Sequence, residues 1–145
     1  MSKTGRCYCG EVTYSFEGEP VFKAECHCRE CQYIAGGAPA FVMGVPEAGF
    51  TYTQGQPRQF TRSDIDNAVT REFCPNCGTH LLTRPPQAHN MGLVMLKVGT
   101  LDEPASYGGP QMVIYCREKQ SFHILPEGVP AFDTVPTGIG EQLKQ

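Results

Sequence analysis

Cys74-Pro75-Asn76-Cys77-Gly78 is the strongest structural signal in this sequence. In a Cys-x-x-Cys-Gly turn the two thiolates point toward one ion, and backbone N–H groups of the turn can hydrogen-bond the sulfurs. The glycine after the second cysteine adopts a positive φ without strain. Because tetrahedral zinc needs four ligands and this turn supplies two, the other pair must come from elsewhere in the chain.

Cys7 and Cys9 are the candidates for that other pair. In an extended segment, Cys-x-Cys places both sulfurs on one face because side chains alternate with a period of two. Both cysteines lie just before an expected strand at 12–16. We therefore predict a closed, structural four-thiolate zinc site made by these two residues with Cys74 and Cys77, which would stabilise the fold. Disulfides or an iron–sulfur site are the alternatives.

A second group, Cys26, Cys28 and Cys31, supplies three thiolates within six residues. Structural zinc sites are closed, whereas catalytic ones keep three protein ligands and one exchangeable position. Gln32 rather than glycine follows Cys31, so we expect a helix start instead of a second turn of the 74–78 kind. The positive end of a helix favours thiolates. A zinc ion there could bind an incoming thiol or polarise a small carbonyl.

Other residues leave alternatives open at this second site. A Cys-x-x-Cys redox pair competes with the metal, but thioredoxin-like motifs lie in a βαβ context that is not expected here. Cys116, which follows apolar residues and is expected to lie in the same strand, is expected to be a packed core thiol. A solvated position is expected for His89 in its proline-rich loop, whereas His123 should face either solvent or a pocket. A fourth protein ligand could close the site, and the candidates are His27, His80 and His123.

The length and charge of the chain limit the function classes. Its 145 residues carry 12 Lys and Arg against 15 Asp and Glu, a formal net charge of −3. This length suits one core, so we expect a single domain over 1–145. The acidic balance argues against a nucleic-acid partner, and no apolar run reaches the roughly 18 residues of a membrane span. The start lacks a secretory signal, which predicts a cytoplasmic protein whose eight cysteines bind metal or react rather than form disulfides.

Glycine and proline, 16 and 12 residues, are spread along the chain and favour short strands joined by turns. A short helix is expected from near Cys28 to Gly36, and coil from Pro126 onward, with fraying over 138–145. We predict a mainly β domain in which two sheets could pack together. Alternating or continuous apolar residues predict strands at 12–16, 40–43, 50–53, 60–61, 93–98 and 112–115.

Several segments together resemble the glutathione-dependent formaldehyde-activating family, which also includes centromere protein V. The segments are CYCG at 7–10, CHCRECQ at 26–32, FCPNCGT at 73–79, VGTLD at 98–102 and FHI at 122–124. The resemblance keeps order and spacing from about residue 5 to 134. It implies a β-tent fold of small antiparallel sheets around zinc, with the four-cysteine set structural and the three-cysteine set at a second metal.

The resemblance also implies an activity, the formation of S-hydroxymethylglutathione from formaldehyde and glutathione. We therefore expect a carbon–sulfur lyase-type enzyme that acts on a thiol–aldehyde adduct and binds the thiol at an open three-cysteine zinc site. The expected cofactors are two zinc ions, one structural and one catalytic, and the partners are a small thiol such as glutathione and a small aldehyde. His123, and after it His27, are the candidate catalytic residues.

One departure from the family pattern and one alternative function remain. Similar members often carry a Pro-Trp-aromatic segment near the end, where this chain has Pro130-Ala131-Phe132. The missing tryptophan would widen any pocket that this segment covers. The alternative is a non-catalytic zinc module that binds a protein partner, because the β-tent fold is shared with an accessory factor of Rab-type small GTPases. The extra three-cysteine set favours the enzyme.

Overall fold

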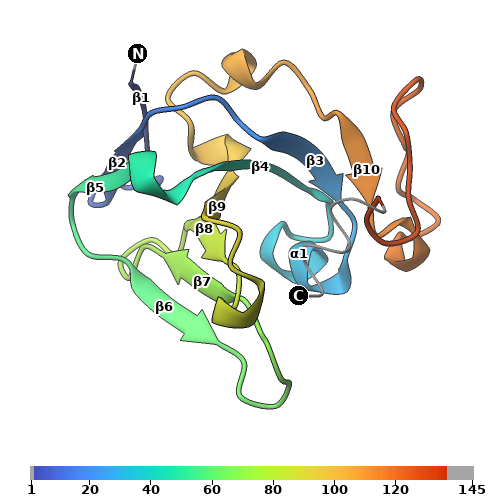
Figure 1. The fold of residues 1–145 in the computed structure, drawn as a ribbon, viewed down its shortest axis with the longest axis horizontal. Coiled ribbons are helices and arrows are strands. Elements are labelled where there is room, and N and C mark those ends of the chain that lie inside the picture. Colours follow the sequence, from blue (N-terminus) through green and yellow to red (C-terminus); the bar gives the residue numbers. More distant parts are fainter. Residues whose placement is uncertain (1, 137–145) are drawn as a thin grey trace.

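The structure is a computed structural model and describes residues 2–136. The fraying predicted for 138–145 lies outside these residues. Strands dominate the described part, which confirms the mainly β prediction (Figure 1). The elements are β1 (Lys3–Arg6), β2 (Thr13–Phe16), β3 (Phe22–Cys26), α1 (Arg29–Ile34), β4 (Ala40–Pro46), β5 (Phe50–Gln54), β6 (Arg58–Thr61), β7 (Thr70–Phe73), β8 (His80–Arg84), β9 (Leu93–Lys97) and β10 (Met112–Ile114), with short 3-10 turns that include η2 (Gln87–His89) and η5 (Cys116–Glu118).

The strands form two sheets. A three-stranded sheet has the order β1-β2-β5, and a seven-stranded sheet has the order β10-β3-β4-β9-β8-β7-β6. Neighbouring strands are antiparallel except β10 and β3, which run parallel. The segment Gly55-Gln56-Pro57 carries the chain from one sheet to the other, since β5 pairs with β2 and β6 pairs with β7.

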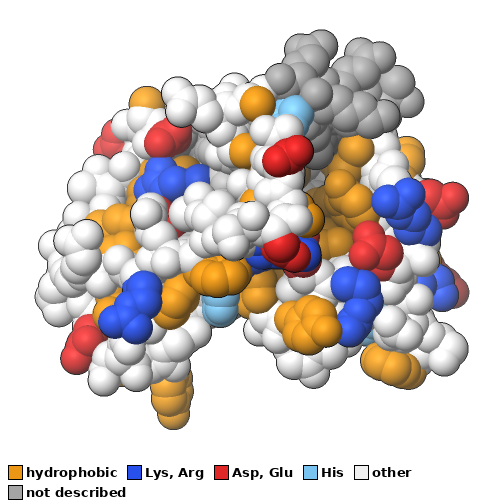
Figure 2. All heavy atoms as spheres, turned by 90° about the horizontal axis from the view of Figure 1, so that it is seen from below, with side chains coloured by type: hydrophobic (Ala, Val, Ile, Leu, Met, Phe, Trp, Pro, Cys, Tyr) orange, Lys and Arg blue, Asp and Glu red, His pale blue; other side chains and the backbone are white. Residues whose placement is uncertain are grey.

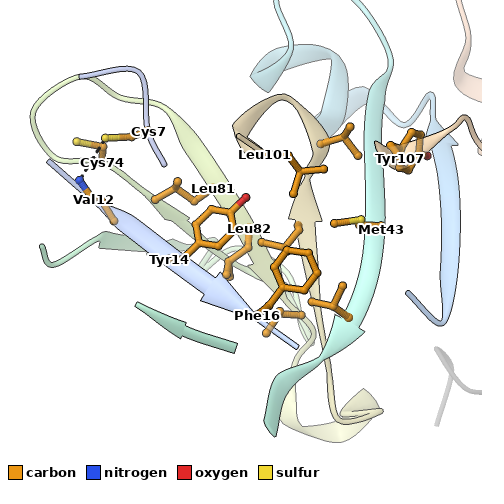
Figure 3. Close-up of a cluster of buried hydrophobic side chains, with 14 residues drawn as sticks. Cys7, Val12, Tyr14, Phe16, Met43, Cys74, Leu81, Leu82, Leu101 and Tyr107 are labelled. Carbon is orange, nitrogen blue, oxygen red and sulfur yellow. Dashed lines mark hydrogen bonds between the residues drawn. The ribbon is translucent and has the colours of Figure 1, made fainter. Parts of the chain in front are cut away.

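The hydrophobic core lies between the two sheets (Figure 3). Tyr14 and Phe16 of β2 are almost completely buried and belong to the same cluster as Met43 and Val45 of β4. Burial of each of these side chains contributes roughly 2 kcal/mol to stability. Because alternate residues of a strand point to opposite faces, Val42 and Gly44 face the other side of the seven-stranded sheet. That second face is not part of this core.

Two local predictions about cysteines are wrong in conformation. Cys7 and Cys9 lie in a tight turn rather than an extended segment, because Gly10 has a φ of +84° and its N–H donates to the carbonyl of Cys7. Cys116 does not lie in a strand, because Tyr115 adopts a left-handed φ of +58° that ends β10 and begins η5. Its side chain is half-buried.

The coil expected after Pro126 lies beside the edge of the large sheet. The N–H of Val113 donates to the carbonyl of Pro130, and the N–H of Phe132 donates back to Val113. Ala131, which stands where the family often has tryptophan, therefore lies directly beside β10. The segment protects an otherwise open strand edge.

The surface carries charges of both signs. Figure 2 shows one face, where acidic and basic side chains lie interspersed with separate hydrophobic patches. Within residues 2–136, no helix has the length and apolar character needed to cross a membrane.

Candidate metal centres

The four sulfurs of Cys7, Cys9, Cys74 and Cys77 lie within 4.8 Å of one another. The Sγ atoms of Cys7 and Cys9 are 3.6 Å apart, and those of Cys9 and Cys74 are 3.7 Å apart. These separations exclude S–S bonds and approach about 3.8 Å, the edge of a tetrahedron with metal–sulfur distances of about 2.3 Å. The donor set therefore fits one tetrahedral thiolate-bound ion, as the sequence predicted.

Backbone and side-chain donors surround these sulfurs. The N–H groups of Asn76 and Cys77 point at Cys74 Sγ (3.4 and 3.5 Å), and the N–H of Val12 donates to Cys7 Sγ (3.3 Å). The hydroxyl of Thr79 lies 3.1 Å from Cys77 Sγ and contributes most to lowering the pKa of Cys77, to about 5. These donors stabilise thiolates and hold them in place.

Cys26, Cys28 and Cys31 form a second cluster, with sulfurs also within 4.8 Å of one another. Cys26 ends β3, Cys28 is the N-cap of α1, and Cys31 lies in its first turn. The N–H of Cys31 donates to the Sγ of Cys28 (3.3 Å), which is a side-chain cap of the helix start. This placement agrees with the helix start predicted from the sequence.

Cys31 is the most acidic thiol of this second cluster. Hydrogen bonds with Cys26 and Cys28, together with the positive charges of Lys97 and Arg71, outweigh burial and lower the pKa of Cys31 to about 3. Hydrogen bonds with Cys28 and Cys31, and burial, raise the pKa of Cys26. Nearby positive charges favour the thiolate form of these cysteines, and the thiolate is the form that binds a metal ion. Three converging thiolates are therefore a suitable donor set for a metal ion.

A cavity of about 420 Å³ opens beside these three cysteines, and all three line it. Its wall also holds two cationic side chains, Arg71 and Lys97, which the sequence did not single out. Each lies in a strand whose amino-acid pattern, taken alone, does not indicate a functional site. A lysine inside the apolar run 93–98 was the available signal for Lys97.

The two candidate catalytic histidines lie together but do not line the cavity. Their rings contact edge to face with centroids 4.9 Å apart. His27 is completely buried, its Nε2 donates to Glu25 (2.9 Å), and its Nδ1 has no hydrogen-bond partner among the described residues. In His123, Nδ1 accepts from the N–H of Gln120 (2.9 Å), while Nε2 donates to the carbonyl of Gly37 (2.6 Å). A catalytic role for either stays a prediction.

The positions of the two remaining histidines, His80 and His89, differ from those expected from the sequence. His80, proposed as a fourth ligand, packs on Phe73 with ring centroids 5.4 Å apart and lies outside both cysteine clusters and the cavity. Burial lowers the pKa of His80. His89, expected to be solvated, lines the cavity from η2, and its Nδ1 is buried without a partner in the described part. His89 is therefore half-buried rather than fully solvated, and Pro85 and Pro86 of the same loop also line the cavity.

Comparisons with known proteins bear on the fold and the family of this chain. A crystal structure of a Rhodobacter sphaeroides protein has a TM-score of 0.54 and 19% identity, and the alignment covers 74% of this chain and 96% of that chain. At this identity the likeness concerns the fold alone. A comparison with curated proteins gives no match. The family model described as "Glutathione-dependent formaldehyde-activating enzyme" matches residues 2–118. The chain belongs to the glutathione-dependent formaldehyde-activating family.

Proposed function

We propose that the protein is a zinc-dependent, carbon–sulfur lyase-type enzyme that acts on a thiol–aldehyde adduct and resembles an S-hydroxymethylglutathione synthase. The observation that carries this proposal is a three-cysteine cluster open to a cavity of about 420 Å³, in a chain of this family. The reaction joins the sulfur of glutathione to the carbon of formaldehyde, and the thiol proton ends on the former carbonyl oxygen. The reverse reaction breaks the same bond.

In this proposal the metal at the three-cysteine cluster offers one coordination position to the substrate. Zinc on Cys26, Cys28 and Cys31 would leave a fourth coordination position for the substrate sulfur and would lower the pKa of that thiol. We assign the Cys7, Cys9, Cys74 and Cys77 set to a structural ion because it is closed by four thiolates. The thiolates of both sets persist in a reducing compartment, so a cytoplasmic location belongs to the same proposal.

The chain's own residues supply positioning and charge. The N–H of Cys31 donates to the Sγ of Cys28 at the helix start, so the first turn of α1 positions two of the three sulfurs. Lys97 and Arg71 in the cavity wall offset the negative thiolates and attract an anionic substrate such as glutathione, which carries carboxylates.

The proton-transfer group is proposed among three histidines. His123 and His27 stay the candidates named from the sequence; their rings contact each other, and neither residue lines the cavity. His89 is the additional candidate because it lines the cavity itself. General acid–base catalysis needs a group within hydrogen-bond reach of the transferred proton, directly or through one water.

Glutathione binding to the zinc-loaded protein tests the proposal, with isothermal titration calorimetry as the readout and exchange NMR of isotope-labelled formaldehyde for turnover. We expect binding and exchange in the wild type and their loss in Cys28→Ser. Cys116→Ser is the matched control, since Cys116 belongs to neither cluster. If neither glutathione nor any other small thiol binds, the enzyme assignment is wrong and the alternative, a zinc module that binds a protein partner, is favoured.

A further inference from the structure

The floor of the cavity is one face of the seven-stranded sheet. Strand register aligns a row of residues across it, and paired residues point to the same side. The row consists of Met112 on β10, Ala24 on β3, Val42 on β4 and Lys97 on β9, and all four line the cavity. At about 4.8 Å per strand, this row extends about 14 Å from an apolar end to a cationic end.

A second row runs parallel to the first, farther from the cysteines. Its members are Phe22, Gly44, Met95, Thr83 and Arg71, on five successive strands from β3 to β7 in sheet order. Gly44 leaves space for the Phe22 ring, because a Cβ there would lie 2.7 Å from a ring carbon. Phe22 and Met95 therefore continue the apolar floor beyond Ala24 and Val42.

Along β3, the apolar floor begins at the sulfur cluster and extends away from it. Cys26, which carries one of the three sulfurs, lies two residues from Ala24 and four from Phe22 on the same face of this strand. At about 3.3 Å per residue, apolar floor extends about 13 Å from the sulfur cluster. A ligand held at the cysteines by its sulfur would place its other substituents on this floor.

Among the charged side chains that the structure describes around the cavity, one cation has no carboxylate partner. Arg71 pairs with Glu30 (3.0 Å), and Glu118 accepts a hydrogen bond from the N–H of Arg29 (3.1 Å). Lys97 makes no ion pair or side-chain hydrogen bond to any residue from 2 to 136, although its positive charge acts on Cys31. A carboxylate in the cavity would satisfy this partly buried ammonium group.

We propose that this cavity selects an amphipathic thiol, free or as its aldehyde adduct. The ligand's sulfur lies at the three cysteines, its carboxylate binds Lys97, and an apolar substituent covers Ala24, Val42 and Met112. This inference rests on the proposed function for the position of the sulfur and adds the substrate class. The adduct of glutathione with formaldehyde has no apolar chain, and it would leave this part of the floor in contact with water.

A series of N-acylcysteines tests the substrate class, because each member carries a thiol, a carboxylate and an adjustable apolar chain. Calorimetric titration of the zinc-loaded protein with the acetyl, butanoyl and hexanoyl members should show Kd falling by up to about fourfold per added methylene. The methyl esters, which lack the carboxylate, should bind about tenfold more weakly than the acids.

Variants test which residues provide the gain in affinity from the carboxylate and from the apolar chain. Lys97→Gln should bind acids and esters equally, and Lys97→Arg should restore the preference for acids. Val42→Thr should reduce the gain from longer chains. Lys119→Gln and Val21→Thr are the matched controls, because both side chains are exposed and neither lines the cavity.

The outcomes separate this inference from the proposed function. If the short thiols bind in a Cys28-dependent manner but neither chain length nor esterification changes Kd, the inference is wrong and the proposed function stands. If no thiol binds at all, the proposed function itself is wrong. The comparison of acids with esters uses only the wild type, so it does not depend on the folding of any variant.

Discussion

The hydroxyl of Tyr52 on β5 donates a 2.6 Å hydrogen bond to the buried carboxylate of Glu72 on β7, and this contact joins the two sheets. Gln59 and Arg84 bind the other oxygen of the same carboxylate, both at 2.7 Å. Three donors on one buried carboxylate make a polar junction at the edge of the hydrophobic core. Loss of any one donor leaves part of a buried charge without compensation.

Tyr52→Phe should therefore destabilise the protein by about 1–3 kcal/mol, since hydrogen bonds to charged groups fall in this range. The substitution keeps the ring, which packs edge to face on Phe50 with centroids 4.9 Å apart. Denaturant unfolding monitored by circular dichroism measures the change. Tyr8→Phe is the control, because Tyr8 is 89% exposed. Equal stability of the two variants would contradict a stabilising role for this contact.

The same carboxylate predicts how stability depends on pH. Burial alone would raise the pKa of Glu72, but hydrogen bonds from Arg84, Tyr52 and Gln59 outweigh burial and hold it below its ordinary value of 4.5. A carboxyl with a depressed folded-state pKa stabilises the fold above the unfolded-state pKa, and this contribution is lost as pH falls through the folded-state pKa. Stability should thus decline in acid below the ordinary glutamate range.

Glu72→Gln tests this assignment, because glutamine cannot titrate. The free energy of unfolding of the variant should be lower than that of the wild type at neutral pH, and the difference should shrink as the solution is acidified below about pH 4.5. Measuring both proteins in parallel cancels the acid loss of thiolate-bound metal, which affects them equally. A difference that stays constant with pH would show that Glu72 does not carry this dependence.

A close contact in the core predicts a third outcome. The ring of Tyr14 lies against Gly5, and the Tyr14 hydroxyl lies 2.7 Å from that of Thr100. A Cβ at Gly5 would overlap the tyrosine and come within 2.5 Å of the backbone carbonyl of Thr100, which cannot move independently. Gly5→Ala should cost about 1–3 kcal/mol through overpacking.

Thermal unfolding measures the effect of Gly5→Ala against Gly99→Ala. A Cβ at Gly99 would meet no atom within 4 Å, and the φ of this glycine is not positive. The control should therefore unfold near the wild-type temperature. If the two alanine variants unfold alike, the packing of Tyr14 on Gly5 does not constrain this position.

The cysteine clusters could be predicted because each signal is local. Cys74-x-x-Cys77-Gly78 and Cys28-x-x-Cys31 fix their own turn and helix start within a few residues. The pairing of Cys7 and Cys9 with that turn followed from ligand number, although the expected extended conformation was wrong. Ligand count is insensitive to whether a strand or a turn presents the sulfurs.

The cavity could not be predicted, because it depends on strand register across the whole sheet. Thr83, Arg71 and Lys97 face one space only because β7, β8, β9 and β4 pair in a particular alignment. The parallel contact of β10 with β3 joins segments far apart in sequence, and local patterns carry no information on it. The same limit explains His89, whose position depends on where the loop after β8 crosses the sheet.

The proposed division of the cysteines into a structural and a reactive set gives the last prediction. Cys74 is buried within the main core cluster, whereas Cys26 lies in a smaller cluster beside the cavity. Cys74→Ser should remove metal from the closed site and unfold or precipitate the protein, since binding free energy at a structural site is folding free energy. Cys26→Ser should lose one zinc ion per chain and stay folded. Elemental analysis of zinc with circular dichroism on both variants measures the two effects, with Cys116→Ser as the control. Only a structural ion is required for the core to form. If Cys74→Ser and Cys26→Ser lose the same amount of metal and fold equally well, the two clusters are not divided into a structural and a reactive site.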